Sequence, residues 1–372
     1  MKRAIALCGG GTKGAYELGV WQALNELQID YQIVTGTSIG SINGALMACK
    51  DYENAKKLWG TIEMQNVMED GINLTNTIEG MYNQKEQIRP FLKKYVKNKG
   101  ADVSPFESFI ETLIDEEAVR KSGIKYGLVT VQVSPVKPQE LTLKDIPQGM
   151  LKEYIMCSSA IFPLFPMHKI DDKTYIDGCY YDNLPIDFAL RMGATEVIAV
   201  DLHTNPSHQE YLNKPFVTYI RPSRSLGTMM NFEREILDAN ISLGYQDAMK
   251  KFGKMAGFCY CFKKEGLEDY QRKIEMFNAK ILRKEGNRPF TKQHELKRIC
   301  QALEEHTEEK VLTKEDYFIR GAEICGELLG IAVEPTYSMP EFIRRIREGM
   351  PFKKRASTVK EEIAELFCKV CI

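Results

Sequence analysis

The chain has 372 residues, which exceeds the usual size of a single hydrophobic core and predicts one large domain with a smaller appendage. Lys and Arg number 50 against 51 Asp and Glu, so the formal net charge of -1 gives no electrostatic footprint for nucleic acid. The ten cysteines are scattered, as in a protein of a reducing compartment. Because the sequence shows neither a signal peptide nor an apolar run of about 18 residues, we expect a cytoplasmic protein without a membrane span.

Short apolar runs alternate with helical patterns as far as about residue 250, which predicts an α/β domain with a largely parallel central sheet over residues 1–252. Strands are expected at Ala4–Cys8, Ile33–Thr35, Leu128–Val133, Thr174–Ile176, Val197–Leu202 and Val217–Ile220. Residues from about 50 to 122 interrupt this alternation with charged, helix-like sequence. We expect a helical insertion there, packed over or beside the core, and one interpretation of it is a lid.

From about Gly253 the sequence changes to charged helical patterns without strand signals, which predicts a helical C-terminal accessory domain over residues 253–372. Three of its helix starts carry capping pairs three residues apart, namely Thr313 with Asp316, Ser338 with Glu341, and Thr358 with Glu361. After the last pair, one helix face is apolar, at Val359, Ile363, Leu366, Phe367 and Val370. The role of this domain does not follow from its sequence.

A glycine-rich loop follows the first predicted strand, and two interpretations compete for it. Gly9, Gly11 and Gly14 satisfy G-x-G-x-x-G, the spacing of a dinucleotide-binding turn. A dinucleotide fold also requires an acidic residue at the end of the second strand, about 20 residues on. Because the second strand ends instead in Gly36-Thr37-Ser38-Ile39-Gly40, we expect the amides of the loop to hold a transient oxyanion.

The run Gly36-Thr37-Ser38-Ile39-Gly40 matches G-x-S-x-G, the pattern of a nucleophile elbow. A serine in such an elbow sits on a sharp strand-to-helix turn, whose two flanking residues approach each other and must lack side chains. Apolar residues recur at helical spacing after the turn, at Ile39, Ile42, Leu46 and Cys49. Ser38 is therefore predicted at a helix N-terminus, where the helix dipole favours developing negative charge.

A serine nucleophile needs a base, and the sequence offers two candidates. Of the five histidines, only His203 follows a predicted strand in a suitable place, and a surface or structural role explains it better. Asp177 is better placed, because it follows the strand Thr174–Ile176 and precedes Gly178. We expect its carboxylate to emerge at a strand end and to accept the serine proton directly.

These motifs together resemble the patatin-like phospholipase family over roughly residues 1 to 250. The matching segments, in family order, are Gly9-Gly10-Gly11-Thr12-Lys13-Gly14, then Gly36–Gly40, then Asp177-Gly178-Cys179. The stretches Ser158–Pro163 and Asn183–Pro185 are also similar to family segments. Cys179 departs from the pattern, since the family usually has Gly or Ala there.

The resemblance implies a three-layer α/β/α fold and a Ser–Asp dyad without histidine, acting on a lipid acyl ester such as a phospholipid. In that mechanism Ser38 attacks the ester, Asp177 takes its proton, and the amides of Gly9, Gly10 and Gly11 form the oxyanion hole. Glycines that keep the motif backbones in shape are Gly14, Gly36, Gly40 and Gly178. No metal or organic cofactor is expected, because Cys368-x-x-Cys371 has no second pair at ligand spacing.

Several alternatives stay open. The chain could be an esterase or thioesterase acting on soluble acyl substrates, or a catalytically weak scaffold whose helical domain binds a protein partner. Lys13 either attracts an anionic head group or is simply solvated. The stretch Phe342–Ser357 carries six Lys or Arg residues, and it is either a peripheral contact with an anionic membrane or a solvated helix face.

Overall fold

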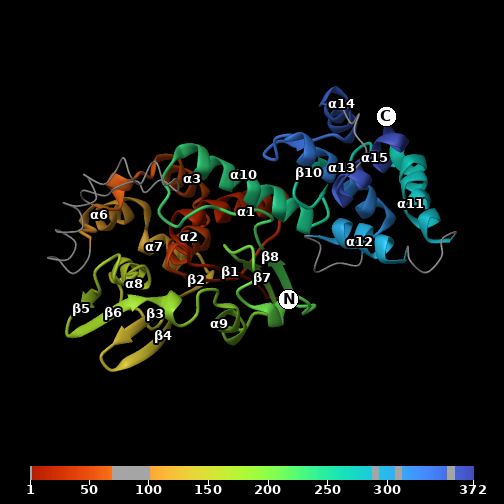
Figure 1. Cartoon of the computed structure of the whole chain (residues 1–372). Coiled ribbons are helices and arrows are strands. Elements are labelled where there is room, and N and C mark those ends of the chain that lie inside the picture. The colour runs from red at the N-terminus through yellow and green to blue at the C-terminus, as the bar shows by residue number, and fades with distance from the viewer. Residues whose placement is uncertain (1, 69–100, 287–292, 306–311, 350–356) are drawn as a thin grey trace. The chain divides into compact units, whose positions relative to one another are not determined.

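The computed structural model describes residues 2–68, 101–286, 293–305, 312–349 and 357–372. It divides into two compact units, Met1–Ala248 and Met249–Ile372 (Figure 1). The expected insertion at about 50–122 includes residues 69–100, which lie outside the described residues.

The first unit is built on an eight-stranded sheet with the order β5-β6-β3-β2-β1-β7-β8, and β4 pairs with β3. The strands are β1 Arg3–Leu7, β2 Ile33–Thr37, β3 Lys125–Val133, β4 Val136–Thr142, β5 His168–Ile170, β6 Lys173–Asp177, β7 Glu196–Val200 and β8 Val217–Ile220. The pairs β3–β2, β2–β1, β1–β7 and β7–β8 are parallel. The pairs β3–β4, β3–β6 and β5–β6 are antiparallel. The expected α/β class and all six expected strands are confirmed.

Two strands of this sheet were not expected. The strand β4 reads Val-Lys-Pro-Gln-Glu-Leu-Thr and is exposed or half-buried throughout, so it lacks the apolar run of a buried strand. Its Pro138 is tolerated because β4 pairs only with β3. The strand β5 has just three residues, which is too short for a pattern to emerge.

Helices cover both faces of the sheet. Consecutive residues of β3 show this, because successive side chains of a strand point to opposite faces. Tyr126 packs toward Gly44 on α2 (Ile39–Ala48), and the next residue, Gly127, packs against Phe188 on α9 (Ile186–Arg191). The three-layer architecture is confirmed. The other helices of this unit are η1 Gly11–Gly14, α1 Ala15–Glu26, α3 Tyr52–Thr61, η2 Met64–Asn66, α6 Ser104–Leu113, α7 Glu116–Lys121, α8 Leu151–Ser158, η3 Gly178–Tyr180 and η4 Gln209–Tyr211.

The helix α10 (Arg234–Lys251) leads into the second unit, which is mainly helical. Its elements are β9 Met255–Ala256, β10 Cys261–Lys263, η5 Glu268–Tyr270, α11 Gln271–Gly286, α12 Gln293–Glu304, α13 Lys314–Leu329, β11 Thr336–Tyr337, α14 Met339–Gly349 and α15 Val359–Cys371. The expectation that this region has no strands is wrong, because β9, β10 and β11 form a small sheet. Strands of two or three residues leave no readable periodicity in a sequence.

The predicted helix starts of the second unit are present. Thr313 with Asp316 and Thr358 with Glu361 form complete capping boxes at α13 and α15. Ser338 accepts the amide of Glu341 at 3.4 Å. The apolar face of α15 packs into this unit's own core, where its residues lie beside Phe277 and Phe318.

The basic stretch Phe342–Ser357 begins within α14, whose apolar side chains Phe342, Ile343 and Ile346 are buried in the core of the second unit. Arg344 and Arg345 form ion pairs with glutamates one turn away on the same helix. This part of the stretch therefore has no free apolar face for insertion into a membrane, and residues 350–356 lie outside the described residues. Among the helices that the structure describes, none combines the length and the hydrophobicity needed to cross a bilayer.

Candidate active site

Ser38 lies at the turn between β2 and α2, as the elbow pattern predicts. Its φ of 55° and ψ of -126° are unusual for a residue with a side chain and carry a strain of about 1–3 kcal/mol. A Cβ on Gly36 would lie 2.1 Å from the carbonyl oxygen of Gly40, and a Cβ on Gly40 would lie 2.7 Å from that of Leu7. Both positions therefore require glycine.

Hydrogen bonds from the sheet hold this strained turn in place. The amide of Ser38 donates to the hydroxyl of Ser158 (2.9 Å), and that hydroxyl donates to the carbonyl oxygen of Val129 on β3 (2.7 Å). Ser158 is itself fully buried. The sequence alone did not indicate this role for Ser158, although the residue opens the stretch Ser158–Pro163 that contributed to the resemblance.

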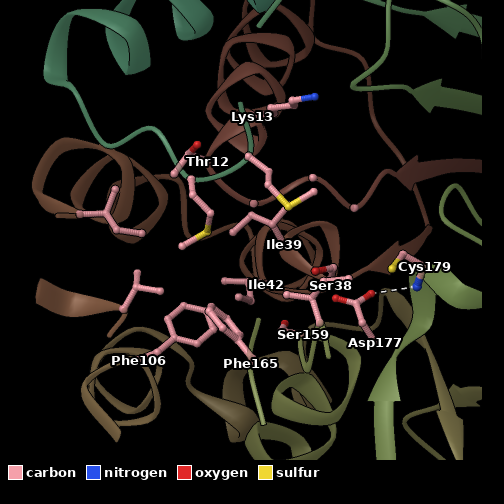
Figure 2. Close-up of a pocket in the computed structure, with 18 of the residues that line it drawn as sticks. Thr12, Lys13, Ser38, Ile39, Ile42, Phe106, Ser159, Phe165, Asp177 and Cys179 are labelled. Atoms are coloured by element: carbon pink, nitrogen blue, oxygen red, sulfur yellow. Dashed lines mark hydrogen bonds between the residues drawn. The ribbon is translucent and has the colours of Figure 1, made fainter. Parts of the chain in front are cut away.

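Asp177 is the last residue of β6, and only 1% of it is exposed. Its carboxylate accepts the amide of Cys179 at 2.8 Å, and its own amide donates to the carbonyl oxygen of Ala160 at 2.9 Å. Burial raises the pKa of Asp177 to about 6, although hydrogen bonds from the Cys179 amide and the Ser38 side chain oppose the rise. The two side chains point toward each other in Figure 2.

The turn after Asp177 is tightly packed. A Cβ on Gly178 would lie 2.2 Å from the carbonyl oxygen of Val129, so only glycine fits at that position. Cys179 is not among the residues with positive φ, and its side chain lines the cavity beside Ser38. The departure from the usual Gly or Ala is therefore accommodated without backbone strain.

The glycine loop lies beside Ser38, and its three amides differ. Gly9 donates its amide to the carbonyl oxygen of Asn183 (3.0 Å), so the expectation that this amide serves the oxyanion hole needs correction. Gly9 instead permits close packing, because a Cβ there would lie 3.1 Å from the Cβ of Ser38. The amides of Gly10 and Gly11 have no acceptor within the described part of the chain.

The conformation of Gly11 explains why the loop must be glycine at that point. Its φ is 58°, and a Cβ would lie 2.2 Å from the carbonyl oxygen of Met229. The same carbonyl accepts the amide of Thr12 at 2.9 Å, so the segment around Met229 holds the loop from outside the segment that comprises β1, α1 and β2. Gly14 faces Ile39 and Trp59, where a Cβ would lie within 3.0 Å of both side chains.

A cavity of about 290 Å³ opens from Ser38. The residues at its polar end are the glycine loop, Ser38 and Asp177. The rest of its wall is mostly apolar, comprising Ile39, Ile42, Trp59, Ile62, Val67, Phe106, Ile161, Phe165, Met229, Met230 and Phe232. Phe106 and Phe165 lie together away from the polar end, with ring centroids 6.1 Å apart (Figure 2).

None of the three histidines whose side chains the structure describes forms a hydrogen bond with Ser38. His203 lines the cavity, but its Nδ1 lies 2.9 Å from a carboxylate oxygen of Asp201. His168 pairs with Glu153, and His208 pairs with Glu210. The side chains of His294 and His306 are outside the described part of the chain. Lys13 also lines the cavity, and Figure 2 shows its side chain directed away from Ser38.

The comparison with protein families agrees with this geometry. A family model described as patatin-like phospholipase matches residues 5–190, which is half of the chain and includes the glycine loop, the elbow and Asp177. The chain belongs to the patatin-like phospholipase family. Its sheet, with the serine turn and the acidic turn at one edge, is the patatin fold.

Similar patatin-like proteins are distant in sequence. Patatin-like phospholipase domain-containing protein 6 from Homo sapiens is 28% identical over 206 residues. Patatin-like phospholipase domain-containing protein 7 from Rattus norvegicus is 27% identical over 205 residues. Lysophospholipase NTE1 from Mycosarcoma maydis is 28% identical over 207 residues. These matches span 54% of this chain but only 13%, 13% and 10% of the three relatives, respectively.

Among solved structures, VipD from Legionella pneumophila aligns with 99% of this chain and 91% of its own, at 13% identity and a TM-score of 0.45. The type III effector protein ExoU aligns with 99% of this chain and 92% of its own, at 13% identity and a TM-score of 0.36.

Proposed function

We propose that this patatin-like chain is a serine acyl hydrolase that cleaves the acyl esters of phospholipids through a dyad of Ser38 and Asp177. The observation that carries the proposal is the position of the Ser38 side chain, which points toward the buried Asp177 carboxylate at the polar end of an apolar cavity. The amides of Gly10 and Gly11, which have no acceptor in the described part of the chain, line the same end. Nucleophile, base, oxyanion donors and acyl site thus meet at one edge of one sheet.

In the first half-reaction, the Ser38 oxygen attacks the ester carbonyl carbon while Asp177 takes the hydroxyl proton. The amides of Gly10 and Gly11 stabilise the resulting oxyanion. When the intermediate collapses, the leaving alcohol takes the proton from Asp177 and an acyl-serine remains. Water, deprotonated by Asp177, then attacks the acyl-serine, and Asp177 returns the proton to the Ser38 oxygen as the fatty acid leaves. A pKa of about 6 suits this role, because the carboxylate is ionised at neutral pH yet is a stronger base than an ordinary aspartate.

The apolar wall of the cavity supports a fatty acyl chain as the group that is transferred. Each methylene buried there contributes about 0.8 kcal/mol, so a chain of several carbons is retained while a short polar acyl group is not. The pair Phe106 and Phe165 lies away from the reacting end, and we assign to it the limit on acyl length.

Substrate in a membrane has to be reached at the membrane surface, and exposed side chains near the site support a peripheral contact. Tyr180 and Tyr181 follow the Asp177 turn and are each 53% exposed, and Met229 at the cavity is 43% exposed. Tyrosine suits the boundary between lipid and water, since its ring is apolar and its hydroxyl is polar.

The test is incubation with a mixed lipid extract, followed by mass spectrometry of released fatty acids and lysolipids. Phospholipid consumption by the unmodified chain and none by Ser38→Ala supports the proposal. Hydrolysis of monomeric short-chain esters without any increase on vesicles would show the soluble esterase instead. Failure of a serine-directed phosphonate to label Ser38 in folded protein would indicate a scaffold.

A further inference from the structure

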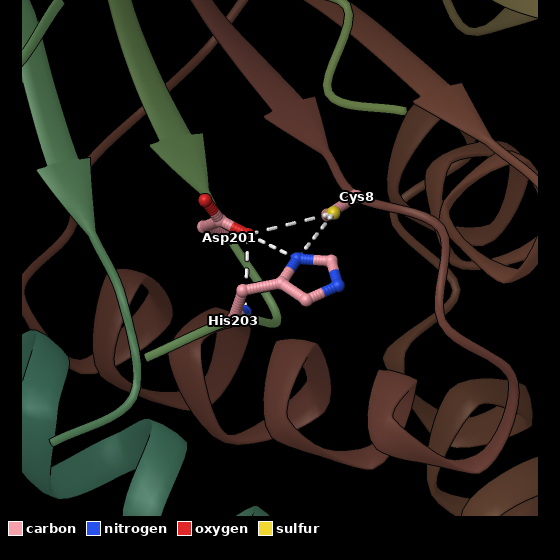
Figure 3. A group of neighbouring side chains, drawn as sticks. All are labelled: Cys8, Asp201 and His203. Atoms are coloured by element: carbon pink, nitrogen blue, oxygen red, sulfur yellow. Dashed lines mark hydrogen bonds and ion pairs between the residues drawn. The ribbon is translucent and has the colours of Figure 1, made fainter. Parts of the chain in front are cut away.

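Three potential metal ligands meet beside the glycine loop without taking part in the proposed hydrolysis. Cys8 directly follows β1, and Asp201 directly follows β7. These strands are parallel neighbours in which Leu7 is paired with Val200, so the next residue of each emerges at the same edge of the sheet. His203 completes the group two residues later (Figure 3).

The spacing of the three ligand atoms suits one tetrahedral ion. Cys8 Sγ lies 3.7 Å from Asp201 Oδ1 and 4.0 Å from His203 Nδ1, and the last two atoms are 2.9 Å apart. Metal–ligand bonds of about 2.3 Å to sulfur and about 2.0 Å to nitrogen and oxygen place tetrahedral ligands about 3.3–3.6 Å apart. Shifts of about half an ångström would therefore bring all three onto one zinc ion.

The surroundings orient the carboxylate and leave a path for an ion. The second oxygen of Asp201 accepts the Tyr219 hydroxyl at 2.6 Å and the Ser207 amide at 2.7 Å, which fixes the carboxylate with Oδ1 toward Cys8 and His203. Cys8 and Asp201 are buried, but the His203 side chain is 43% exposed and lines the cavity. An ion can enter from the cavity, and a water molecule can take the fourth position.

We propose that Cys8, Asp201 and His203 bind one divalent cation of the zinc class, and that the bound ion inhibits the enzyme. A thiolate and an imidazole in the ligand set favour Zn²⁺ over Mg²⁺ or Ca²⁺, which prefer oxygen ligands. Binding forms the metal–sulfur bond and releases the proton of the Cys8 thiol to solvent. The metal also replaces the proton through which His203 Nδ1 contacts Asp201, and the neutral ring then carries its proton on Nε2. This goes beyond the proposed hydrolysis, which uses none of the three side chains.

Inhibition follows from the contacts of Cys8 with the loop. Its Sγ lies 3.4 Å from the carbonyl oxygen of Gly9 and accepts the side-chain amide of Asn183 at 3.2 Å. The same Asn183 amide donates to the Gly9 carbonyl at 3.0 Å, and the Asn183 carbonyl accepts the Gly9 amide. Drawing Cys8 onto an ion breaks its share of these contacts and shifts the loop that carries the oxyanion donors.

Binding is tested with Co²⁺, which reports its ligands by absorption. Full-length protein freed of metal by a chelator is titrated, with expected saturation at one equivalent, a thiolate charge-transfer band in the near ultraviolet and intense visible bands of a tetrahedral site. Cys8→Ser should abolish the charge-transfer band, and His203→Gln should weaken affinity at least tenfold. Cys49→Ser, a partly buried cysteine at the end of α2, is the matched control and should keep both.

Absence of a thiolate band in the unmodified chain would overturn the site, as would an unchanged band in folded Cys8→Ser. If Cys8→Ser does not fold, unchanged Co²⁺ affinity in His203→Gln would overturn it equally. These binding measurements need no hydrolysis, so their outcome is independent of the proposed function.

The inhibitory role rests on the proposed function, and inhibition is measured with Zn²⁺ and a soluble ester, relative to the metal-free rate of each variant. We expect strong inhibition of the unmodified chain and relief in His203→Gln, whereas saturation without inhibition would overturn the inhibitory role.

Discussion

The two ends of the cavity are built in different ways. At the polar end, backbone positions set the geometry: glycines allow close approaches, the main-chain amide of Ser38 is held by the Ser158 hydroxyl, and the main-chain amide of Cys179 holds the Asp177 carboxylate. At the other end, the wall consists of large side chains such as Phe106 and Phe165. We therefore expect almost any substitution at the polar end to abolish hydrolysis. Substitutions at the apolar end should instead alter which acyl group is accepted.

The largest expected effect is that of Ser38→Ala. Removal of the nucleophile leaves only binding and oxyanion stabilisation, so we expect turnover to fall by several orders of magnitude, to about 10³-fold over the uncatalysed rate. Steady-state rates on a chromogenic ester measure this, with circular dichroism to verify folding. Ser104→Ala, an exposed serine, is the control. A folded Ser38→Ala protein that keeps most of the activity would exclude Ser38 as the nucleophile.

Asp177→Asn should nearly abolish turnover and phosphonate labelling of Ser38, because the amide cannot take a proton.

The substitution Asp177→Asn should also stabilise the fold at neutral pH. The pKa of Asp177 is raised from 3.8 to about 6, so ionising it costs the folded state about 3 kcal/mol at pH 8. This cost is nearly absent below about pH 4, where both states are protonated, grows between about pH 4 and pH 6, and levels off above pH 6, where both states are ionised. Urea unfolding at pH 8 and pH 4 should therefore show the gain only at pH 8. Undiminished labelling in folded Asp177→Asn would contradict the dyad.

The pH profile tests the same carboxylate without a mutation. Because the proposed role of Asp177 is that of the base, kcat/KM should rise with pH through a single acid limb and level off above it. The midpoint is expected at about pH 6, the pKa that burial gives this side chain. An acid limb with its midpoint near pH 4 would mean that the base is an ordinary exposed carboxylate and not one that burial shields from water.

A smaller effect is expected for Asn183→Ala, which tests the support of the glycine loop. The Asn183 side chain donates to the Gly9 carbonyl at 3.0 Å, whereas its main chain, which accepts the Gly9 amide, is retained in the variant. We expect kcat to fall about tenfold with little change in KM, because a misplaced oxyanion donor weakens the transition state more than the bound substrate. A rise in KM with unchanged kcat would assign Asn183 to substrate binding instead.

The smallest effect on rate, and the one that tests the apolar end, belongs to Phe106→Ala. The shortened side chain should extend the cavity and shift the preferred ester toward longer acyl chains by a few-fold in kcat/KM, while the reaction itself continues. A series of esters of increasing chain length measures this, and Phe165→Ala should shift it in the same direction. An equal loss on all chain lengths would show that the pair supports the fold rather than the acyl site.

The contrast between the two ends also explains what the sequence could predict. Gly36, Ser38, Gly40 and Asp177 are readable because backbone requirements leave short, fixed motifs. The occupied amide of Gly9 was not readable, since its acceptor lies on Asn183, 174 residues away. Phe106 was equally hidden, because it reaches the cavity from a helix distant in sequence that carries no motif.

Secondary structure follows the same division. Six strands of the sheet were predicted because short apolar runs mark them, and β4 was missed because its residues are exposed or half-buried and mostly polar. In the second unit, helix caps such as Thr313 with Asp316 leave a local sequence pattern, which predicted the helix starts. The strands β9, β10 and β11 have only two or three residues each, which is too short for a readable pattern.

The carbonyl of Val129 contacts the structural supports of both members of the proposed dyad. On one side it receives the Ser158 hydroxyl that holds the Ser38 amide, and on the other the Gly178 turn rests against it. The supports of the proposed nucleophile and base therefore contact the same atom, which lies in the sheet and not in the cavity wall. Residues of the cavity wall can therefore be substituted to accept other acyl groups, in evolution or in the laboratory, while Ser38 and Asp177 keep their relative positions.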